Sequence, residues 1–301
     1  MRVEVKKSTP TVLNVLIERI QNLKKLGKLE DAIRAAETGA ESARRLIESR
    51  PDQACNLMTC LELLGDLLRD FGKDLEAESV YVEALSLEGV ESIERIQLAR
   101  IKSSLACIYD NNSLIDEAII LYNQAIDIFS SLNRLPHIDI ANIRNNLGML
   151  YKNRQDYEIA EENYMIALEI FEKNLGSSSH EVAAVYNNLG TLFYDSGFLS
   201  QSREMHEQAL DILSQSKESS EPDLGQSHAN LAASLGKIGE IDESIVNYRL
   251  AINFLEKNLN NGSAIYEITC ENYSNLLKQI GKKRKANSIQ KKAKRLVTKF
   301  T

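Results

Sequence analysis

Proline, glycine and tryptophan are scarce in this sequence. Its 301 residues include 4 Pro, 14 Gly and no Trp. Proline and glycine punctuate short strands and turns, so their scarcity argues against a β-sandwich or a β-barrel. The apolar fraction of 43% is large enough to build a core. The composition therefore favours a helical protein.

Long apolar runs and paired cysteines are also missing. No stretch approaches the roughly 18 apolar residues of a membrane span, and the opening MRVEVKKSTP does not resemble a signal peptide. The four cysteines show no CxxC spacing and lie in helical patterns, at Cys55, Cys60, Cys107 and Cys270. Free thiols are typical of a reducing compartment, so we expect a cytoplasmic protein.

Motifs of catalysis are absent as well. The sequence contains neither a GxxxxGK[ST] phosphate loop nor an HExxH metal site. Its four histidines have structural explanations, and we expect His206 to lie in the core because related positions carry tyrosine. We therefore predict that the protein is not an enzyme and needs no cofactor or metal.

An internal repeat is the strongest positive signal. The segment IRNNLGMLY at residues 143–151 returns as VYNNLGTLF at 185–193, an offset of 42 residues. Extending this offset marks one turn in each repeat, at Gly27, Gly72, Ser113, Gln155, Gly197, Gly239 and Gly281. A fixed period of this size predicts a solenoid of stacked units, here about seven pairs of antiparallel helices.

Small and large side chains alternate in fixed columns of the repeat. Seven residues before each turn stand Ile20, Gly65, Ala106, Gly148, Gly190, Ala232 and Ser274. Nine residues after each turn stand Ala36, Tyr81, Tyr122, Tyr164, His206, Tyr248 and Gln290. Small residues let two helices approach closely and large ones fill the space between them, so these columns predict antiparallel packing.

These motifs resemble the tetratricopeptide repeat, whose common period is about 34 residues. The 42-residue version with NNLGxLY is similar to the kinesin light chain and nephrocystin type, and the best-matching segments are 144–176 and 178–213. The resemblance covers about residues 11–300. It implies an all-α, right-handed α-solenoid. We expect one domain over residues 1–301, with a basic capping helix over 282–301.

Asparagine occupies one structural position in four successive repeats. Nine residues before the turn stand Asn146, Asn188, Asn230 and Asn272. A carboxamide offers a donor and an acceptor together, so it can pair with the main chain of an extended peptide. By the resemblance, the first helix of each pair lines the inner wall, and this asparagine ladder holds a bound peptide. The alternative is that these side chains bond to neighbouring helices and only fix repeat stacking.

Helical periodicity adds neighbours to the ladder. On the same face we expect Asn142, Asn145, Met149, Asn153, Asn187, Thr191 and Gln226. At the rim of the groove, Lys152, Tyr194 and Lys237 are candidates for side-chain selectivity. The predicted wall is therefore polar and rich in amides.

Charge is unevenly distributed along the chain. Residues 278–301 hold ten Lys or Arg and no acid, so the rest carries −17 within a total of −7. An apolar stripe runs through the same segment, at Ala286, Ile289, Ala293, Leu296 and Phe300. We interpret it as an amphipathic terminal helix whose basic face meets solvent, with binding of anions or nucleic acid as the alternative.

These observations predict a non-enzymatic scaffold that binds a peptide segment of a partner protein in its concave groove. One alternative is a structural protein whose end repeats self-associate into a homo-oligomer. Another is nucleic-acid or anion binding through the basic end, which steep salt dependence would reveal.

Overall fold

The computed structural model describes residues 12–132, 137–216 and 220–298. Over these residues the chain forms fourteen α-helices and one short 3₁₀ helix, and no strand. It divides into two compact units, Met1–Asp139 and Ile140–Thr301. The predicted all-α fold of seven helix pairs is confirmed for the described part of the chain, whereas the single continuous domain stays a prediction.

Unit 1 contains three helix pairs and the 3₁₀ turn η1 (Pro51–Gln53). The pairs are α1 (Val12–Lys25) with α2 (Leu29–Ser49), α3 (Ala54–Asp70) with α4 (Asp74–Leu85), and α5 (Arg95–Asn111) with α6 (Ile115–Ser130). Leucine, isoleucine and alanine side chains from these helices form one core.

Unit 2 contains four helix pairs, the first of which starts just before the boundary between the units. The pairs are α7 (His137–Asn153) with α8 (Tyr157–Leu175), α9 (His180–Asp195) with α10 (Leu199–Gln215), α11 (Glu221–Ile238) with α12 (Ile241–Glu256), and α13 (Leu259–Gln279) with α14 (Lys283–Val297). The first helices α9, α11 and α13 contact one another in order, so they form a continuous wall.

A left-handed residue sits in the turn of every pair. The seven residues have φ between 61° and 101° and are Gly27, Gly72, Ser113, Gln155, Gly197, Gly239 and Gly281. These are the residues at which the sequence places its turns. Glycine adopts this conformation without strain, whereas other L-residues do so at a cost.

Two of these turns hold a residue other than glycine, so their backbone strain can be relieved by a substitution to glycine. Ser113 and Gln155 are exposed and hold φ values of 61° and 66°. We expect Gln155→Gly and Ser113→Gly each to raise the free energy of unfolding by about 0.5–1 kcal/mol, measured by urea denaturation. Gly197→Ala, at φ 86°, is the matched control and should lower it by a similar amount. Destabilisation by both glycine variants would contradict this account of the turns.

Glycines of the first helix pack against rings of the second helix. A Cβ atom placed on Gly148 would lie 2.6 Å from the Tyr164 ring, and one on Gly190 would lie 2.5 Å from the His206 ring. Both rings are buried, at 0% and 1% exposure. The glycines thus allow the close helix approach that the alternating columns predict.

Local capping fixes where helix α11 begins. The Ser220 hydroxyl accepts a hydrogen bond from the Asp223 backbone N–H, and the Asp223 carboxylate accepts one from the Ser220 backbone N–H. Pro222 lies in the first turn, where its missing N–H costs nothing. This reciprocal pair stabilises the start of a helix that contributes to the site below.

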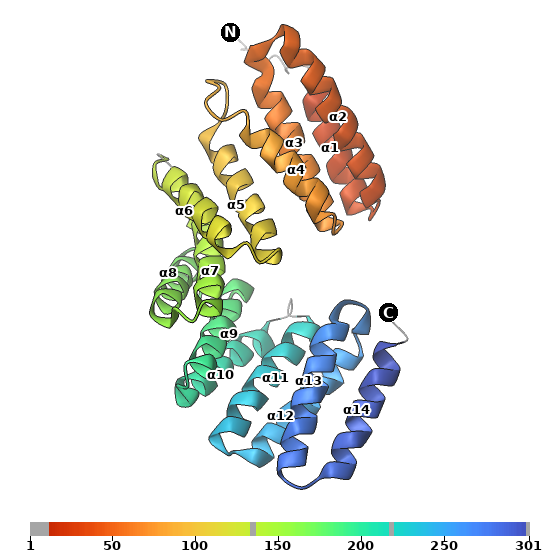
Figure 1. The fold of residues 1–301 in the computed structure, drawn as a ribbon, viewed down its shortest axis with the longest axis vertical. Coiled ribbons are helices and arrows are strands. Elements are labelled where there is room, and N and C mark those ends of the chain that lie inside the picture. Colours follow the sequence, from red (N-terminus) through yellow and green to blue (C-terminus); the bar gives the residue numbers. More distant parts are fainter. Residues whose placement is uncertain (1–11, 133–136, 217–219, 299–301) are drawn as a thin grey trace, which may run out of the picture. The chain divides into compact units, whose positions relative to one another are not determined.

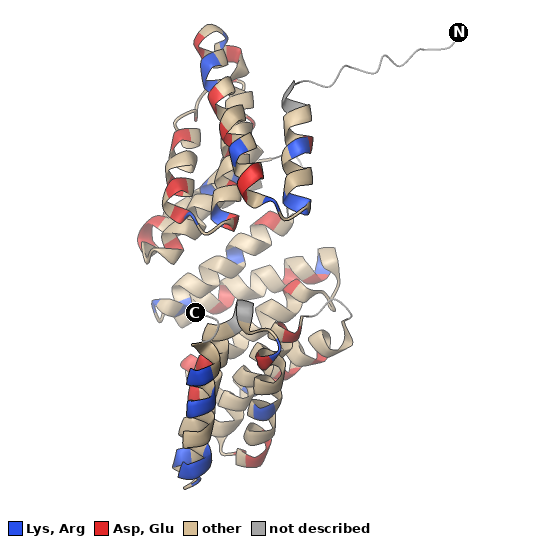
Figure 2. Cartoon of the chain, turned by 90° about the vertical axis from the view of Figure 1, so that its right-hand side faces the viewer, with Lys and Arg blue, Asp and Glu red and all other residues tan. Residues whose placement is uncertain are grey.

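Helix α14 is amphipathic. Ala286 and Ala293 are buried, and Ile289 and Leu296 pack beside them, while its basic residues face solvent. Figure 2 shows the Lys and Arg positions along this helix. Phe300, the last member of the expected stripe, lies outside the described residues.

The four cysteines are free thiols, with Cys60 and Cys270 buried and Cys55 and Cys107 half-buried.

Within the described ranges, no helix combines the length and the hydropathy that a bilayer crossing requires. Over the same ranges, no cluster of His, Cys, Asp or Glu has the makings of a metal site.

Candidate functional site

A pocket of about 430 Å³ opens on the wall formed by α9, α11 and α13 of unit 2. Its lining residues are Thr191, Tyr194, Asp195, His206, Asn230, Ala233, Gly236, Lys237, Tyr248, Asn272, Asn275, Leu276 and Gln279. Three successive first helices supply the walls, and His206 and Tyr248 come from the second helices behind them. The site is therefore a product of repeat stacking within unit 2.

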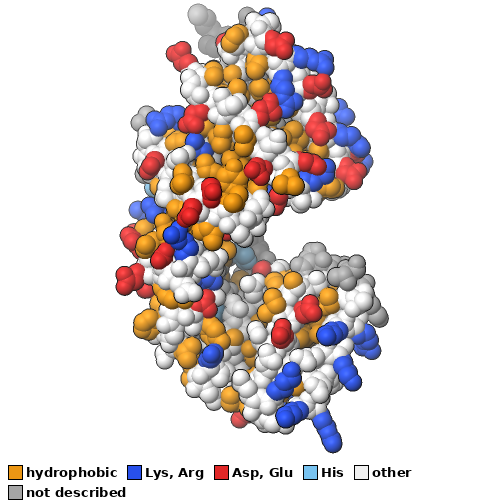
Figure 3. All heavy atoms as spheres, viewed as in Figure 1, with side chains coloured by type: hydrophobic (Ala, Val, Ile, Leu, Met, Phe, Trp, Pro, Cys, Tyr) orange, Lys and Arg blue, Asp and Glu red, His pale blue; other side chains and the backbone are white. Residues whose placement is uncertain are grey.

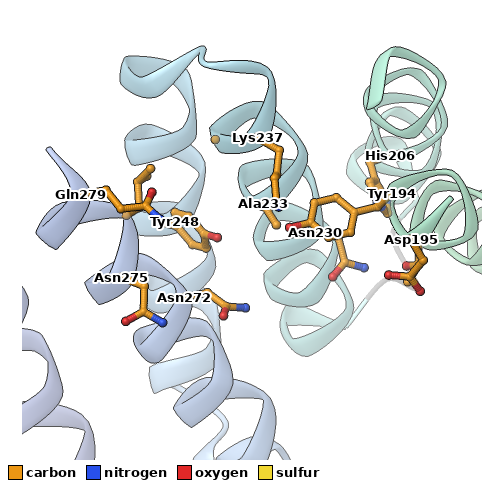
Figure 4. A pocket seen from close by; sticks show the side chains of 13 residues that line it. Tyr194, Asp195, His206, Asn230, Ala233, Lys237, Tyr248, Asn272, Asn275 and Gln279 are labelled. Carbon is orange, nitrogen blue, oxygen red and sulfur yellow. The ribbon is translucent and has the colours of Figure 1, made fainter. Parts of the chain in front are cut away.

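Carboxamides dominate the polar lining. Asn230 projects from α11, and Asn272, Asn275 and Gln279 project from α13 (Figure 4). Among the described residues, the side chains of Asn230 and Asn272 form no hydrogen bond. Each of them offers a donor and an acceptor to whatever enters the pocket.

The two adjacent asparagines of α9 have a different role. Asn188 Nδ2 donates a hydrogen bond of 2.8 Å to Asn145 Oδ1 of α7. Asn187 Nδ2 donates one of 2.6 Å to Ser227 Oγ of α11, and its Oδ1 accepts one of 3.1 Å from His206 Nδ1. These side chains join three successive helix pairs. These hydrogen bonds favour the stacking alternative for Asn187 and Asn188, and peptide binding by either residue stays a prediction.

The other residues predicted for the site fall into three groups: those that line the pocket, those exposed outside it, and those half-buried beside other side chains. Thr191, Tyr194 and Lys237 line the pocket together with Asn230 and Asn272. Outside it, the exposed residues are Asn142, Met149, Asn153 and Gln226. Asn146 is half-buried and already engaged by a neighbour, and Lys152 lies 3.8 Å from the Asp195 carboxylate.

Electrostatics keep the pocket mostly neutral. Burial lowers the pKa of His206 to about 4, so this ring is uncharged at neutral pH. Burial, and then the Asp195 carboxylate, raise the pKa of Tyr194, so its hydroxyl remains a hydrogen-bond donor. Lys237 and Asp195 are the charged residues of the lining. The site suits polar main-chain recognition better than recognition of a strongly charged ligand.

Sequence reasoning missed Asn275, Gln279 and Tyr248. The signal was present for two of them: Asn275 and Gln279 lie six and two residues before the turn at Gly281. In the fifth repeat the same positions hold Thr191 and Asp195, which also line the pocket. Applying the same columns to the seventh repeat would have added Asn275 and Gln279 to the predicted Asn272 on α13.

Comparisons with known proteins agree with this geometry. Family models described as tetratricopeptide repeat match residues 139–215 and 99–131. The solved structure of BtubC (BKLC) from P. vanneervenii is 34% identical, with a TM-score of 0.64, and the match covers 75% of this chain and 90% of that one. No curated protein sequence matches the chain.

Two further solved structures are similar at lower identity. A Podosopora anserina putative kinesin light chain with nearly identical TPR-like repeats is 18% identical, with a TM-score of 0.56, and the match covers 70% of this chain and 100% of that one. The apo form of RapI is 16% identical, with a TM-score of 0.72, and the match covers 96% and 100%. Likeness at this identity concerns the fold alone.

Stacked helix pairs with the repeat sequence of the family define a tetratricopeptide repeat α-solenoid, a class of protein–protein interaction scaffold. The repeat length of 42 residues and the match to BtubC (BKLC) indicate the type of repeat within this class. The chain belongs to the tetratricopeptide repeat family and, within it, to the kinesin light chain-like type.

Proposed function

We propose that this protein is a non-enzymatic scaffold that binds an extended peptide segment of a partner protein in the pocket of unit 2. The observation that carries the proposal is the pair of carboxamides, Asn230 and Asn272, which face the pocket on neighbouring first helices without a partner among the described residues. An extended peptide presents alternating C=O and N–H groups, which two stacked carboxamides can pair with.

The ladder in this proposal is shorter than the one predicted from the sequence. Its available amides lie on α11 and α13, because Asn145, Asn187 and Asn188 of the earlier first helices form hydrogen bonds between helices. Tyr194 and Lys237 lie on the pocket wall, where they would contact side chains of the peptide. A cytoplasmic location remains a prediction.

The test compares proteins captured from a cell extract by wild type and by Asn230→Ala/Asn272→Ala. Each net hydrogen bond is worth about 0.5–1.5 kcal/mol, so losing two should weaken a groove-bound partner by about tenfold or more. Mass spectrometry of the captured proteins, followed by titration of the recovered partner, measures this loss. Asn188→Ala is avoided because it would also break the bond to Asn145.

Gln201→Ala/Gln208→Ala is the matched control, since both are exposed amides of α10 in the same unit that lie outside the pocket and outside the predicted wall. It should retain the partner. If both double variants lose the partner equally, or neither does, groove binding through Asn230 and Asn272 is wrong. A sedimentation coefficient that rises with concentration would instead indicate self-association.

A further inference from the structure

A second hollow, of about 300 Å³, lies between α12 and α14 and is floored by α13. Tyr273 of its floor follows directly after Asn272, which lines the first pocket. Adjacent residues of a helix point about 100° apart, so the two sites use different faces of α13. The hollow is therefore a separate feature of unit 2.

Positive charge converges on this hollow from two helices. Arg249 comes from α12, and Lys285 and Lys292 come from α14. The acidic residue of the lining, Glu256, accepts hydrogen bonds from Lys292 Nζ at 2.8 Å and from the Tyr266 hydroxyl at 2.9 Å. Arg249 and Lys285 form no ion pair within the described ranges, so the lining carries an excess of two positive charges. Figure 3 shows basic side chains gathered over this part of unit 2.

The floor of the hollow contains a buried donor without a partner. Tyr273 is 1% exposed, stacks on Tyr248 at 5.3 Å between ring centroids, and lies 5.9 Å from Lys285 Nζ. Its hydroxyl makes no hydrogen bond to any described residue. This hydroxyl is shielded from solvent, as is the equally unpartnered Tyr164 hydroxyl, so the hollow offers a ligand the Tyr273 ring and not its donor.

The residues that build the hollow depart from the protein's own repeat. In the column of Lys285, the six earlier repeats carry Asp31, Glu76, Glu117, Ile159, Gln201 and Glu243. In the column of Tyr273, they carry Arg19, Leu64, Leu105, Leu147, Leu189 and Leu231. The last repeat thus replaces a mostly acidic position by lysine and a mostly leucine position by tyrosine. A capping helix needs a polar outer face, but it does not need a buried phenol beneath it.

We infer that this hollow binds a phosphate monoester. The guanidinium of Arg249 and the ammonium of Lys285 are donors of two kinds, and they come from the two helices that flank the hollow. A phosphate monoester carries a charge of about −1.5 to −2 at pH 7, which matches the excess of two positive charges, whereas a carboxylate carries a single negative charge. The volume suits a phosphorylated side chain or a small phosphate ester.

Isothermal titration calorimetry of the full chain with inorganic phosphate and with O-phospho-L-serine tests the inference. We expect saturable binding with a dissociation constant of about 1 mM or below. Arg249→Ala and Lys285→Ala should each weaken it about tenfold. Tighter binding of phosphoserine than of phosphate would identify a phosphorylated chain as the ligand source, and equal binding would identify a small phosphate.

Lys283→Ala/Arg284→Ala is the matched control, because both residues are exposed on α14 and neither lines the hollow. It should change the affinity less than twofold, and circular dichroism should show every variant folded. Absence of saturable binding at about 10 mM ligand, or an equal loss in the control, would overturn the inference. Since these probes and variants leave the pocket of Asn230 and Asn272 untouched, the result is independent of the proposed peptide binding.

Discussion

Acid should destabilise the fold by about 3 kcal/mol through one residue, His206. Its ring is 1% exposed and packs against Gly190, and burial lowers its pKa from 6.5 to about 4. Above pH 6.5 the ring is neutral whether the chain is folded or unfolded, so it adds no pH dependence there. Between pH 6.5 and 4 the unfolded chain binds a proton that the folded chain rejects, so stability falls as the pH falls.

Urea denaturation of wild type at several pH values measures this loss. His206→Tyr should remove it, because the same column already carries Tyr122, Tyr164 and Tyr248 as buried rings. His137→Gln, at the exposed start of α7, is the control and should leave the acid dependence as in wild type. A His206→Tyr protein with unchanged acid dependence would show that another group titrates.

Tyr164→Ala should cost about 3–5 kcal/mol of folding free energy, the largest loss we expect from a single truncation. The ring is fully buried and rests on Gly148, where a Cβ would lie 2.6 Å from it. Removing it leaves a cavity between α7 and α8 that these helices cannot close without shifting. Met165→Ala, at the next position and 51% exposed, is the matched control and should stay within about 0.5 kcal/mol of wild type.

A double-mutant cycle isolates the contact between Gly148 and the Tyr164 ring. Alone, Gly148→Ala should destabilise, since overpacking costs about 1–3 kcal/mol against a gain in helix propensity of about 1 kcal/mol. In the Tyr164→Ala background the same change should stabilise, because the ring is gone and only the propensity gain remains. Denaturation curves that show additive effects would mean that the ring does not rest on Gly148.

Much of the fold could be predicted because the same physical demands recur in every repeat. A left-handed turn favours glycine, so Gly197, Gly239 and Gly281 mark the period, and Gln155 is found only by continuing it. The demand for close helix approach similarly leaves Gly148 opposite Tyr164. Such constraints act within one helix pair, at fixed sequence separation, and so they are visible in the sequence.

The candidate site was less predictable, because a column gives the face of a helix but not the partner of a side chain. Asn188 and Asn230 occupy the same column, yet Asn188 meets Asn145 of α7 while Asn230 faces an open pocket. The difference depends on which side chain the preceding repeat presents. Asn187 is occupied in the same way, by Ser227 of the following pair and by His206 of its own. Only the packed structure separates engaged amides from available ones.

The order of contacts in unit 2 also bears on how the chain opens. Among the described residues, the main packing partners of the last helix pair, α13 and α14, are α11 and α12. Opening the last pair therefore disrupts one interface and leaves α7 to α10 packed, as in a linear array with nearest-neighbour coupling. Amide hydrogen exchange should become slower from α14 inward instead of occurring in a single cooperative step. The hollow between α12 and α14 lies across this least protected interface. A ligand bound there would hold α14 against α12 and so slow the opening of the last helix pair.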